Sequence, residues 1–285
     1  MSESVILAGA CTPSADLFSG LGSLDSLSLL GIVMESALER AGVASDVDCA
    51  IVAQEQAWRA VRRARIPDRV PAVSVSGSRR CGLHVVALAD RLIRTGERDV
   101  VVVGGVGPSG GVVPLPGTLR SRSREVPAQA VAPGDTVPQA DVTARPGATA
   151  GPSVPRRADC AVAIVLMRRA RADRLRLPWL ALVGAHGTAE EGAVSSYADA
   201  VRVLHRALRE VPATLNDLSL VEVHRSAVVE NTAGMPNPPR AFDATGVRVL
   251  LRLAQSLERE GRGMGAVSIW GDHPAEALVI CPPDS

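Results

Sequence analysis

The stretch from residue 70 to residue 105 constrains the fold of this chain more than any other. It reads VPAVSV, then SGSRRCGLHVVALADRLIRTGERD, and then VVVVGG. Both apolar runs are short and continuous, which is typical of strands that are covered on both faces. The middle segment has apolar residues at helical spacing and ends at Gly96, where a left-handed C-cap is favourable. The pattern predicts a buried strand, a helix and a second buried strand, joined by a right-handed crossover in a parallel sheet.

The turn at residues 76–82, which leads into that helix, is the first candidate site. A helix N-terminus gathers unpaired N–H groups and partial positive charge, so a thiol held there ionises more easily. Cys81 is therefore a candidate nucleophile. His84 follows three residues later, one turn into the predicted helix, where its imidazole can approach Cys81 as a Cys/His pair.

These segments resemble the thiolase superfamily. In its nucleophile turn a strand ends in Asn, two residues intervene, and Cys-x-Ser-Gly-Leu begins a buried helix. Aligned without gaps, Ser76 stands in the place of the Asn, Arg79 in the place of the nucleophilic Cys, and Cys81 in the place of the Ser. A register shifted by two residues puts Cys81 in the nucleophile's place instead. We prefer the ungapped alignment, and the shifted one stays open.

The resemblance extends over nearly the whole chain. Residues 6–43 are similar to the thiolase opening, whose helix ends in Ala-Leu-Glu-Arg-Ala-Gly-Val. The resemblance implies a thiolase-like α/β protein with five layers, α-β-α-β-α, and two similar halves at residues 1–168 and 178–285. The remaining strands are predicted at residues 5–10, 48–53, 160–167, 179–185, 220–224, 266–270 and 277–281, and the remaining helices at residues 24–41, 197–211 and within 243–260.

Residues 107–157 are rich in Pro, Gly, Ala and Ser and show no sustained helical or strand period. In thiolases a longer inserted loop domain lies here and supplies much of the coenzyme A site, so the resemblance implies a shortened loop region. Arg120, Arg122 and Arg124 form a basic cluster that could contact a phosphopantetheine or an acidic acyl carrier protein. Solvated surface charge is the alternative interpretation, and no cofactor is predicted.

Composition excludes several classes of function. The chain of 285 residues has a net charge of +1 and only 2% aromatic residues, which argues against binding to nucleic acid or to an anionic membrane. No stretch approaches the roughly 18 apolar residues of a membrane span, and the first residues do not resemble a signal peptide. A cytoplasmic protein is expected. The five cysteines lack the spacing of a zinc site, so no metal is predicted.

A thiolase needs a Cys nucleophile, an oxyanion hole and a general base. Where the family has Asn-Glu-Ala-Phe this chain has a run that begins at His224, Arg240 replaces the His of Gly-His-Pro, and Ile269 replaces the Cys of Cys-x-Gly. None of these segments keeps a thiolase base. Ser76, Arg79, Arg240 and Ile269 are therefore interpreted as vestigial site positions.

His224 has a second interpretation. Val-Glu-Val-His resembles the strand-end Val-Glu-Ala-His of ketosynthases, in which that His supports decarboxylation or condensation. His224 is thus a candidate catalytic residue, or else a remnant that serves as a structural hydrogen-bonding group. Surface or loop positions are predicted for His186 and His205, and a turn for His273.

A lost site on a retained scaffold implies a pseudoenzyme, a non-catalytic or regulatory subunit that resembles the chain-length factors of polyketide synthases. In the superfamily the strand at Val70 to Val75 lies at a sheet edge and pairs with a second subunit. The resemblance therefore implies a homodimer, or a heterodimer with a thiolase or ketosynthase of polyketide or lipid metabolism. The alternative is an acyltransferase or thioester hydrolase that uses Cys81 with His84 or His224.

Overall fold

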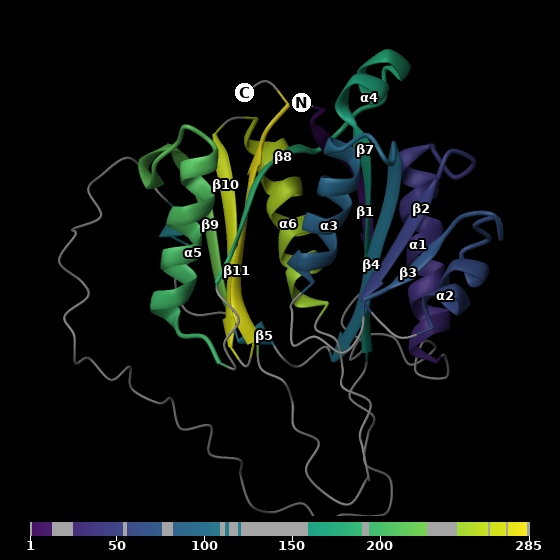
Figure 1. Ribbon diagram of the computed structural model, residues 1–285, viewed down its shortest axis with the longest axis horizontal. Helices are drawn as coiled ribbons and strands as arrows, with labels where there is room; N and C mark the ends of the chain where they lie inside the picture. Colours follow the sequence, from purple (N-terminus) through teal and green to yellow (C-terminus); the bar gives the residue numbers. More distant parts are fainter. Residues whose placement is uncertain are drawn as a thin grey trace, which may run out of the picture.

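Figure 1 shows the computed structural model of the chain, in which helices and strands form layers that stand side by side. The structure describes residues 2–12, 25–53, 56–75, 82–108, 112–113, 119–120, 159–189, 194–226, 244–261, 263–271 and 273–283. The strands are β1 (Ser4–Cys11), β2 (Cys49–Ala53), β3 (Ala72–Ser74), β4 (Val100–Pro108), β5 (Val112–Val113), β6 (Leu119–Arg120), β7 (Asp159–Arg168), β8 (Ala181–Thr188), β9 (Leu218–Ser226), β10 (Met264–Gly271) and β11 (His273–Cys281). The helices are α1 (Ser26–Ala41), α2 (Ala57–Arg63), α3 (Leu83–Arg94), α4 (Arg169–Leu175), α5 (Tyr197–Glu210) and α6 (Thr245–Glu260), with a 3₁₀ turn at Leu215–Asp217.

The strand order shows an internal repeat. In the N-terminal half it is β3-β2-β4-β7-β1, with β2 parallel to β3 and β4, and with β7 antiparallel to both of its neighbours. In the C-terminal half it is β8-β11-β10-β9, where β9 and β10 are parallel and β11 is antiparallel to both neighbours. Counted outward from β1 and from β8, the strands correspond in pairs: β7 with β11, β4 with β10, and β2 with β9. In the sequence, the segment that corresponds to β3 would lie between β9 and α6, at residues 227–243, which are outside the described residues.

The two halves meet where β1 pairs with β8, through Val5 with Leu182 and Ile6 with Ala181. A hydrophobic core between the sheets takes side chains from α3 and α6 and from strands of both halves. A second core packs α1 and α2 on the outside of the N-terminal sheet, and a third packs α5 on the outside of the C-terminal sheet. Figure 1 shows these five layers in order, from α5 on the left to α1 and α2 on the right. The predicted five-layered fold is confirmed.

Local sequence explains the helix ends. Gly96 has a positive φ angle, as the sequence predicted for a helix stop, and so do Gly42 and Gly261 after α1 and α6. The Asp25 side chain caps α1 by accepting hydrogen bonds from the N–H groups of Leu27 and Ser28. The Ser28 hydroxyl also donates to this carboxylate, and these bonds hold the pKa of Asp25 below its usual value.

Two predictions of local structure were wrong, and helix α2 was missed because no element was predicted at residues 57–63. His186, predicted on the surface or in a loop, lies within strand β8. The segment at Val70 to Val75 was expected to be a strand covered on both faces, but β3 has only three residues, and Val73 is 37% exposed. Its exposure follows from its place at the end of the sheet, where β2 is its only strand neighbour in the described part of the chain.

A buried ionic cluster joins the two halves near β1. The Asp90 carboxylate of α3 accepts a hydrogen bond from Ser4 Oγ at 2.5 Å and two from Arg94 Nε at 2.8 and 2.9 Å. Arg94 also donates to the carbonyl groups of Val183 and Gly184 on β8, at 2.7 and 2.8 Å. Burial raises the pKa of Asp90, and the bonds from Ser4 and Arg94 partly offset that rise.

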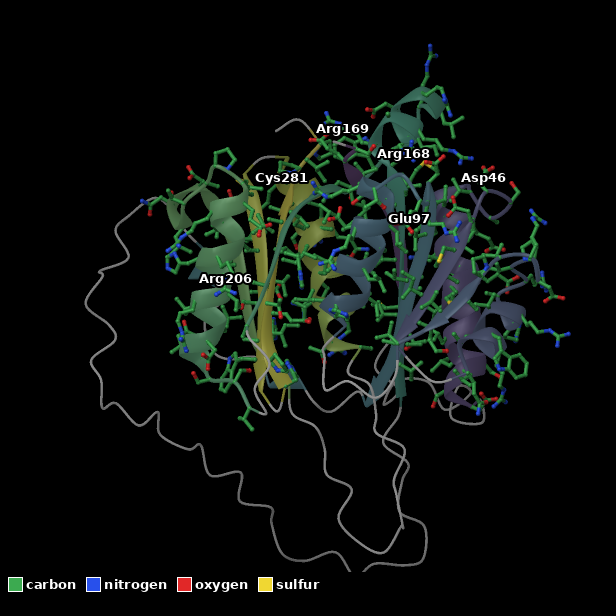
Figure 2. All side chains as sticks on the ribbon, in the orientation of Figure 1. Asp46, Glu97, Arg168, Arg169, Arg206 and Cys281 are labelled. Carbon is green, nitrogen blue, oxygen red and sulfur yellow. The ribbon has the colours of Figure 1, made fainter. Side chains whose placement is uncertain are left out.

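Further charged residues gather where the chain termini lie. Figure 2 shows Arg168, Arg169 and Asp46 at this end of the molecule. Arg168 pairs with Asp99 at 2.7 Å, and Arg171 bridges Asp46 and Asp99 at 3.2 and 3.4 Å. None of the helices that the structure describes is long and apolar enough to cross a membrane.

Candidate functional site

One row of residues crosses the inner face of the C-terminal sheet and carries the described site candidates. The pairing register aligns His224 of β9 with Ile269 of β10, and Ile269 with Glu276 of β11. Residues aligned in this way point to the same side of a sheet. The side is the one that faces α3 and α6, since Ile269 belongs to the core between the two sheets. The row therefore places two polar side chains on either side of a fully buried isoleucine.

His224 is held by a carboxylate on its own strand. Its Nε2 lies 2.8 Å from Oε2 of Glu222, which is two residues away and therefore on the same face of β9. Arg252 of α6 approaches the other carboxylate oxygen at 3.9 Å. His224 is 7% exposed, and its Nδ1 has no hydrogen-bond partner among the described residues. The ring is thus positioned by the contact of Nε2 with Glu222, while Nδ1 is buried without a hydrogen bond to any described residue.

His84 forms a second carboxylate–imidazole pair, from α3. Its Nδ1 lies 3.5 Å from Oε1 of Glu276. Glu276 is only 1% exposed, whereas the His84 side chain is 26% exposed. The 3.5 Å separation of Nδ1 and Oε1 is an ion-pair distance rather than a hydrogen bond, and it places a buried carboxylate beside an imidazole that can accept or donate a proton. The structure therefore gives His84 a carboxylate partner that the sequence did not predict.

The helix that carries His84 begins close to α6. Helix α3 starts at Leu83, and a Cβ atom added to Gly246 of α6 would lie 2.6 Å from the Leu83 nitrogen. No side chain fits between the two helix starts, so Gly246 is required for this close approach. The N-terminal turns of α3 and α6 are thereby held at a fixed spacing.

Several predicted site residues lie outside the described part of the chain. These are Ser76, Arg79, Cys81 and Arg240. Whether Arg79 or Cys81 takes the nucleophile position, and whether His84 approaches Cys81, therefore stay predictions. Within the described residues, no group of three or more His, Cys, Asp or Glu side chains is arranged to hold a metal ion.

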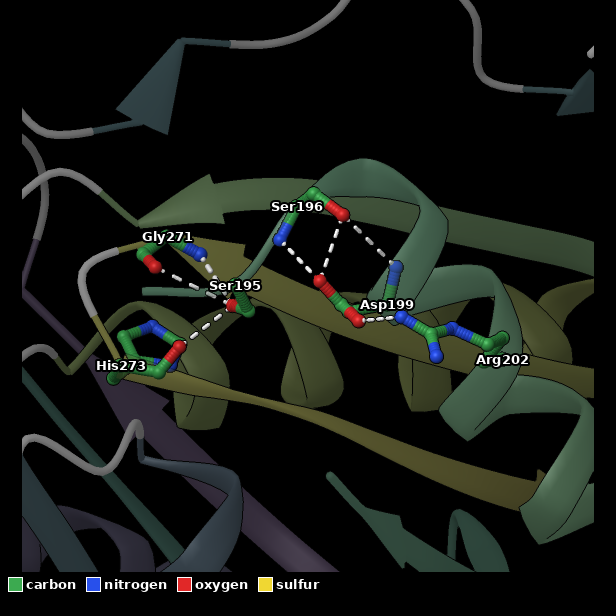
Figure 3. A network of polar contacts seen from close by, with 6 residues as sticks. All are labelled: Ser195, Ser196, Asp199, Arg202, Gly271 and His273. Atoms are coloured by element: carbon green, nitrogen blue, oxygen red, sulfur yellow. Dashed lines mark hydrogen bonds and ion pairs between the residues drawn. The ribbon is translucent and has the colours of Figure 1, made fainter. Parts of the chain in front are cut away.

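The hairpin that follows Ile269 is clamped from the side of α5. Figure 3 shows Ser195, whose hydroxyl donates to the His273 carbonyl at 2.6 Å and accepts from the Gly271 N–H at 3.0 Å. The Ser195 N–H donates to the Gly271 carbonyl at 2.7 Å. His273, predicted on a turn, is the first residue of β11 and is 2% exposed. The clamp fixes the strand ends that carry Ile269 and Glu276.

Sequence reasoning missed Glu222, Glu276 and Ser195. A signal was present for the two carboxylates, because each is a single acid with apolar neighbours on both sides: VEV on β9 and AEALVI on β11. Acidic side chains are almost never fully buried unless they are paired. Ser195 gave no such signal, since its role depends on the distant Gly271 and His273.

The comparisons with known proteins agree with this arrangement. The family model for the thiolase N-terminal domain matches residues 4–140. A probable acetyl-CoA acetyltransferase of Mycolicibacterium smegmatis is 24% identical over 386 residues, which covers 97% of this chain and 100% of that protein. Since the chain has 285 residues, about 100 positions of that relative have no counterpart here. A probable acetyl-CoA acetyltransferase of Mycobacterium tuberculosis is 40% identical over 114 residues, but the match spans 37% of this chain and 29% of that protein.

Solved structures share the fold over nearly the full length. An acetyl-CoA acetyltransferase from Syntrophomonas wolfei superposes with a TM-score of 0.65 at 17% identity, covering 99% of this chain and 100% of that one. Human mitochondrial 3-ketoacyl-CoA thiolase gives the same TM-score and identity, covering 99% of each chain. At this identity the likeness shows the fold alone. Residues 4–140 thus match the thiolase N-terminal domain, and nearly the whole chain has the thiolase fold.

Proposed function

We propose that this chain is a non-catalytic subunit that docks onto an acyl-condensing enzyme of polyketide or lipid metabolism. The observation that carries the proposal is the outer edge of β3, which no other strand of the described residues covers. Pro71 and Val75 use their carbonyl and N–H groups, respectively, to bond to β2. Because these groups alternate in direction along a strand, those of Ala72 and Ser74 face away from the sheet. Such an edge is a template for another strand.

The described site positions support a loss of thiolase chemistry. Ile269 stands where the resemblance places a second Cys, and it is fully buried and aliphatic, so it can neither transfer a proton nor act as a nucleophile. His224 has one ring nitrogen occupied by Glu222. The two bacterial relatives described above are probable acetyl-CoA acetyltransferases. We infer that this chain keeps their scaffold and shapes or stabilises a partner's site.

The test combines an activity assay with a block of the β3 edge. We expect no cleavage of acetoacetyl-CoA by the purified chain, even at high protein concentration. Co-expression with a thiolase or ketosynthase encoded beside its gene, followed by native mass spectrometry, should give a complex. Ala72→Pro removes an outward N–H and should abolish that complex, whereas Ala72→Val keeps the N–H and should preserve it. A complex that survives Ala72→Pro contradicts docking through β3.

A second candidate function rests on the His84–Glu276 pair. An imidazole paired with a carboxylate, three residues from Cys81 in the sequence, suits a cysteine acyltransferase or thioester hydrolase. The Cys81 thiolate would attack the thioester carbonyl and release the thiol of the substrate. The proton of Cys81 would pass through His84 Nε2 to that leaving thiolate, which leaves an acyl group on Cys81.

Intact-mass measurement after incubation with acetyl-CoA distinguishes the two functions. An acetyl adduct that Cys81→Ala and His84→Ala both abolish, and that the exposed-histidine control His205→Ala preserves, establishes the second function. Absence of any adduct in the wild-type chain supports the non-catalytic subunit.

A further inference from the structure

We propose that the partner that docks on β3 is a different polypeptide, one that presents acidic side chains beside its own edge strand. This inference rests on the proposed docking through β3 and adds the chemical class of the partner. The docking surface, here called the α2–β3 surface, consists of the exposed side chains Trp58, Arg59, Arg62, Arg63, Arg69 and Val73. Helix α2 contacts β3 directly, because the Ala57 N–H donates to Ser74 Oγ at 3.0 Å.

The charge of this surface differs from that of the whole chain. Residues 56–75 contain five arginines and one acid, Asp68, which gives this segment a charge of +4, whereas the entire chain carries +1. The acids nearby neutralise only part of it. Arg62 lies 4.0 Å from Asp68, and Arg63 and Arg65 lie 4.0 and 3.1 Å from Glu35 of α1. With both Asp68 and Glu35 counted against the five arginines, a charge of +3 remains on this surface.

The surface also has the residue types of a protein-binding site. Trp58 on α2 is 54% exposed, and Val73 on β3 is 37% exposed. Trp58 lies over a hollow of about 340 Å³ that is lined by three arginines and by Asp25 at the start of α1. Trp and Arg carry most of the binding energy at protein interfaces, and arginine forms bidentate pairs with carboxylates. The combination fits a partner that supplies an edge strand, an apolar contact and carboxylates.

A second copy of this chain fits the same surface poorly. A two-fold dimer through β3 brings the same patch of both copies together. The two α2 helices would then lie on the same face of the joined sheet, each with its arginines. Like charges brought together in this way lower affinity, and the effect is largest at low salt. An acidic partner turns that repulsion into attraction.

The experiment uses a charge-reversed form of the chain as an acidic partner of known composition. The variant Arg59→Glu/Arg62→Glu/Arg63→Glu is mixed with the wild-type chain, and association is measured by sedimentation velocity and native mass spectrometry. At 50 mM NaCl the mixed dimer should form at least about tenfold more tightly than either homodimer. Raising NaCl to 500 mM should remove most of that preference. Circular dichroism and thermal melting confirm that each variant is folded.

The matched control reverses three exposed arginines on the other outer helix, α5. Arg206 lies on α5, on the opposite side of the molecule from α2 (Figures 1 and 2). The variant Arg202→Glu/Arg206→Glu/Arg209→Glu should bind the wild-type chain no better than the wild type binds itself. Equal binding of the two triple variants, a wild-type homodimer as tight as the mixed dimer, or no mixed dimer at 50 µM each overturns the inference.

The β3 variants separate failure of this inference from failure of the proposed function. If Ala72→Pro abolishes association between the chains but charge reversal leaves their affinity unchanged, docking through β3 stands and the acidic partner is rejected. Association that survives Ala72→Pro rejects docking through β3, and the inference with it.

Discussion

The two halves of the molecule repeat the same strand order, yet their outer edges differ. In the C-terminal half β9 is covered by the chain itself, since β5 and β6 pair antiparallel with it. In the N-terminal half β3 ends the sheet with no further strand among the described residues. A repeated architecture therefore does not imply repeated use. Among the described residues, one edge is covered by other strands of the chain, and the other, which lies beside the basic helix α2, is not.

The inner faces of the two sheets differ as well. The N-terminal sheet presents mainly aliphatic side chains to the central layer, such as those of Ile51, Val103 and Ile164, and its buried polar Ser4 lies at the start of β1, where it bonds to Asp90. The C-terminal sheet presents Glu222, His224 and Glu276 among its apolar residues. Burial of paired charges is costly compared with apolar packing, so the polar row is not explained by stability. The comparison directs attention to the C-terminal face as the place where function persists or once existed.

The largest expected effect tests whether the halves behave as one unit. Asp90→Ala leaves Arg94 without its carboxylate partner at the junction of α3, β1 and β8, and should lower the free energy of unfolding by about 3 kcal/mol. Urea denaturation followed by circular dichroism measures the loss, with the exposed Asp173→Ala as control. We expect one cooperative transition. Two separate transitions would show that the halves are less coupled than the shared central layer indicates.

A smaller effect is expected at the polar row. His84→Leu leaves the buried Glu276 carboxylate without its imidazole and should destabilise the chain by about 2 kcal/mol. The double variant His84→Leu/Glu276→Leu makes this position as apolar as the N-terminal sheet and should recover the loss or exceed wild-type stability by about 1 kcal/mol. Thermal melting of the single and double variants measures both. A double variant less stable than His84→Leu contradicts the view that the pair is retained at a cost.

Helix caps provide the next comparison between the halves. Ser196→Ala removes the capping box that Ser196 forms with Asp199 at the start of α5, and should cost about 1 kcal/mol. Asp25→Ala removes the corresponding cap of α1 and should cost a similar amount. Urea denaturation of both variants compares the two outer helices. A loss confined to one variant would show that one outer layer does not contribute to the cooperative unit.

The smallest effect is the pH dependence of the α5 cap. The Ser196 hydroxyl donates to the Asp199 carboxylate, an ion pair with Arg202 assists, and the pKa of Asp199 lies below its usual value. A depressed pKa gives stability that is present above the unfolded pKa, 3.8, and is lost as pH falls through the lower folded pKa. The difference in unfolding free energy between wild type and Asp199→Asn, about 0.5 kcal/mol, should therefore be constant above about pH 5 and shrink below pH 3.8. A difference that grows on acidification would reverse the assigned direction.

The fold was predictable because its signals are local and repeated. Short apolar runs marked β1, β4 and β7, and glycine stops marked the ends of α1, α3 and α6. The three-residue strand β3 and the arginine-rich helix α2 were less visible. An edge strand loses the continuous apolar pattern, and α2 buries only Ala57, Ala60 and Val61.

The candidate site was less predictable because its contacts join distant parts of the chain. His84 and His224 could be named from motifs, but the Glu276 that faces His84 lies almost two hundred residues further along. No spacing rule connects a residue on α3 with one on β11. The register that brings His224, Ile269 and Glu276 into one row depends on three strands that pair in both directions.

The central layer makes the chain indivisible. Each half contributes one helix to it, α3 from the first half and α6 from the second, and each helix packs with residues from both sheets. A gene fragment that encodes either half alone would expose that entire apolar surface to water, and its product would aggregate or demand a chaperone. Division of this protein into two genes would therefore succeed only if both fragments were made together and reassembled around Gly246, where the starts of the two helices meet without an intervening side chain.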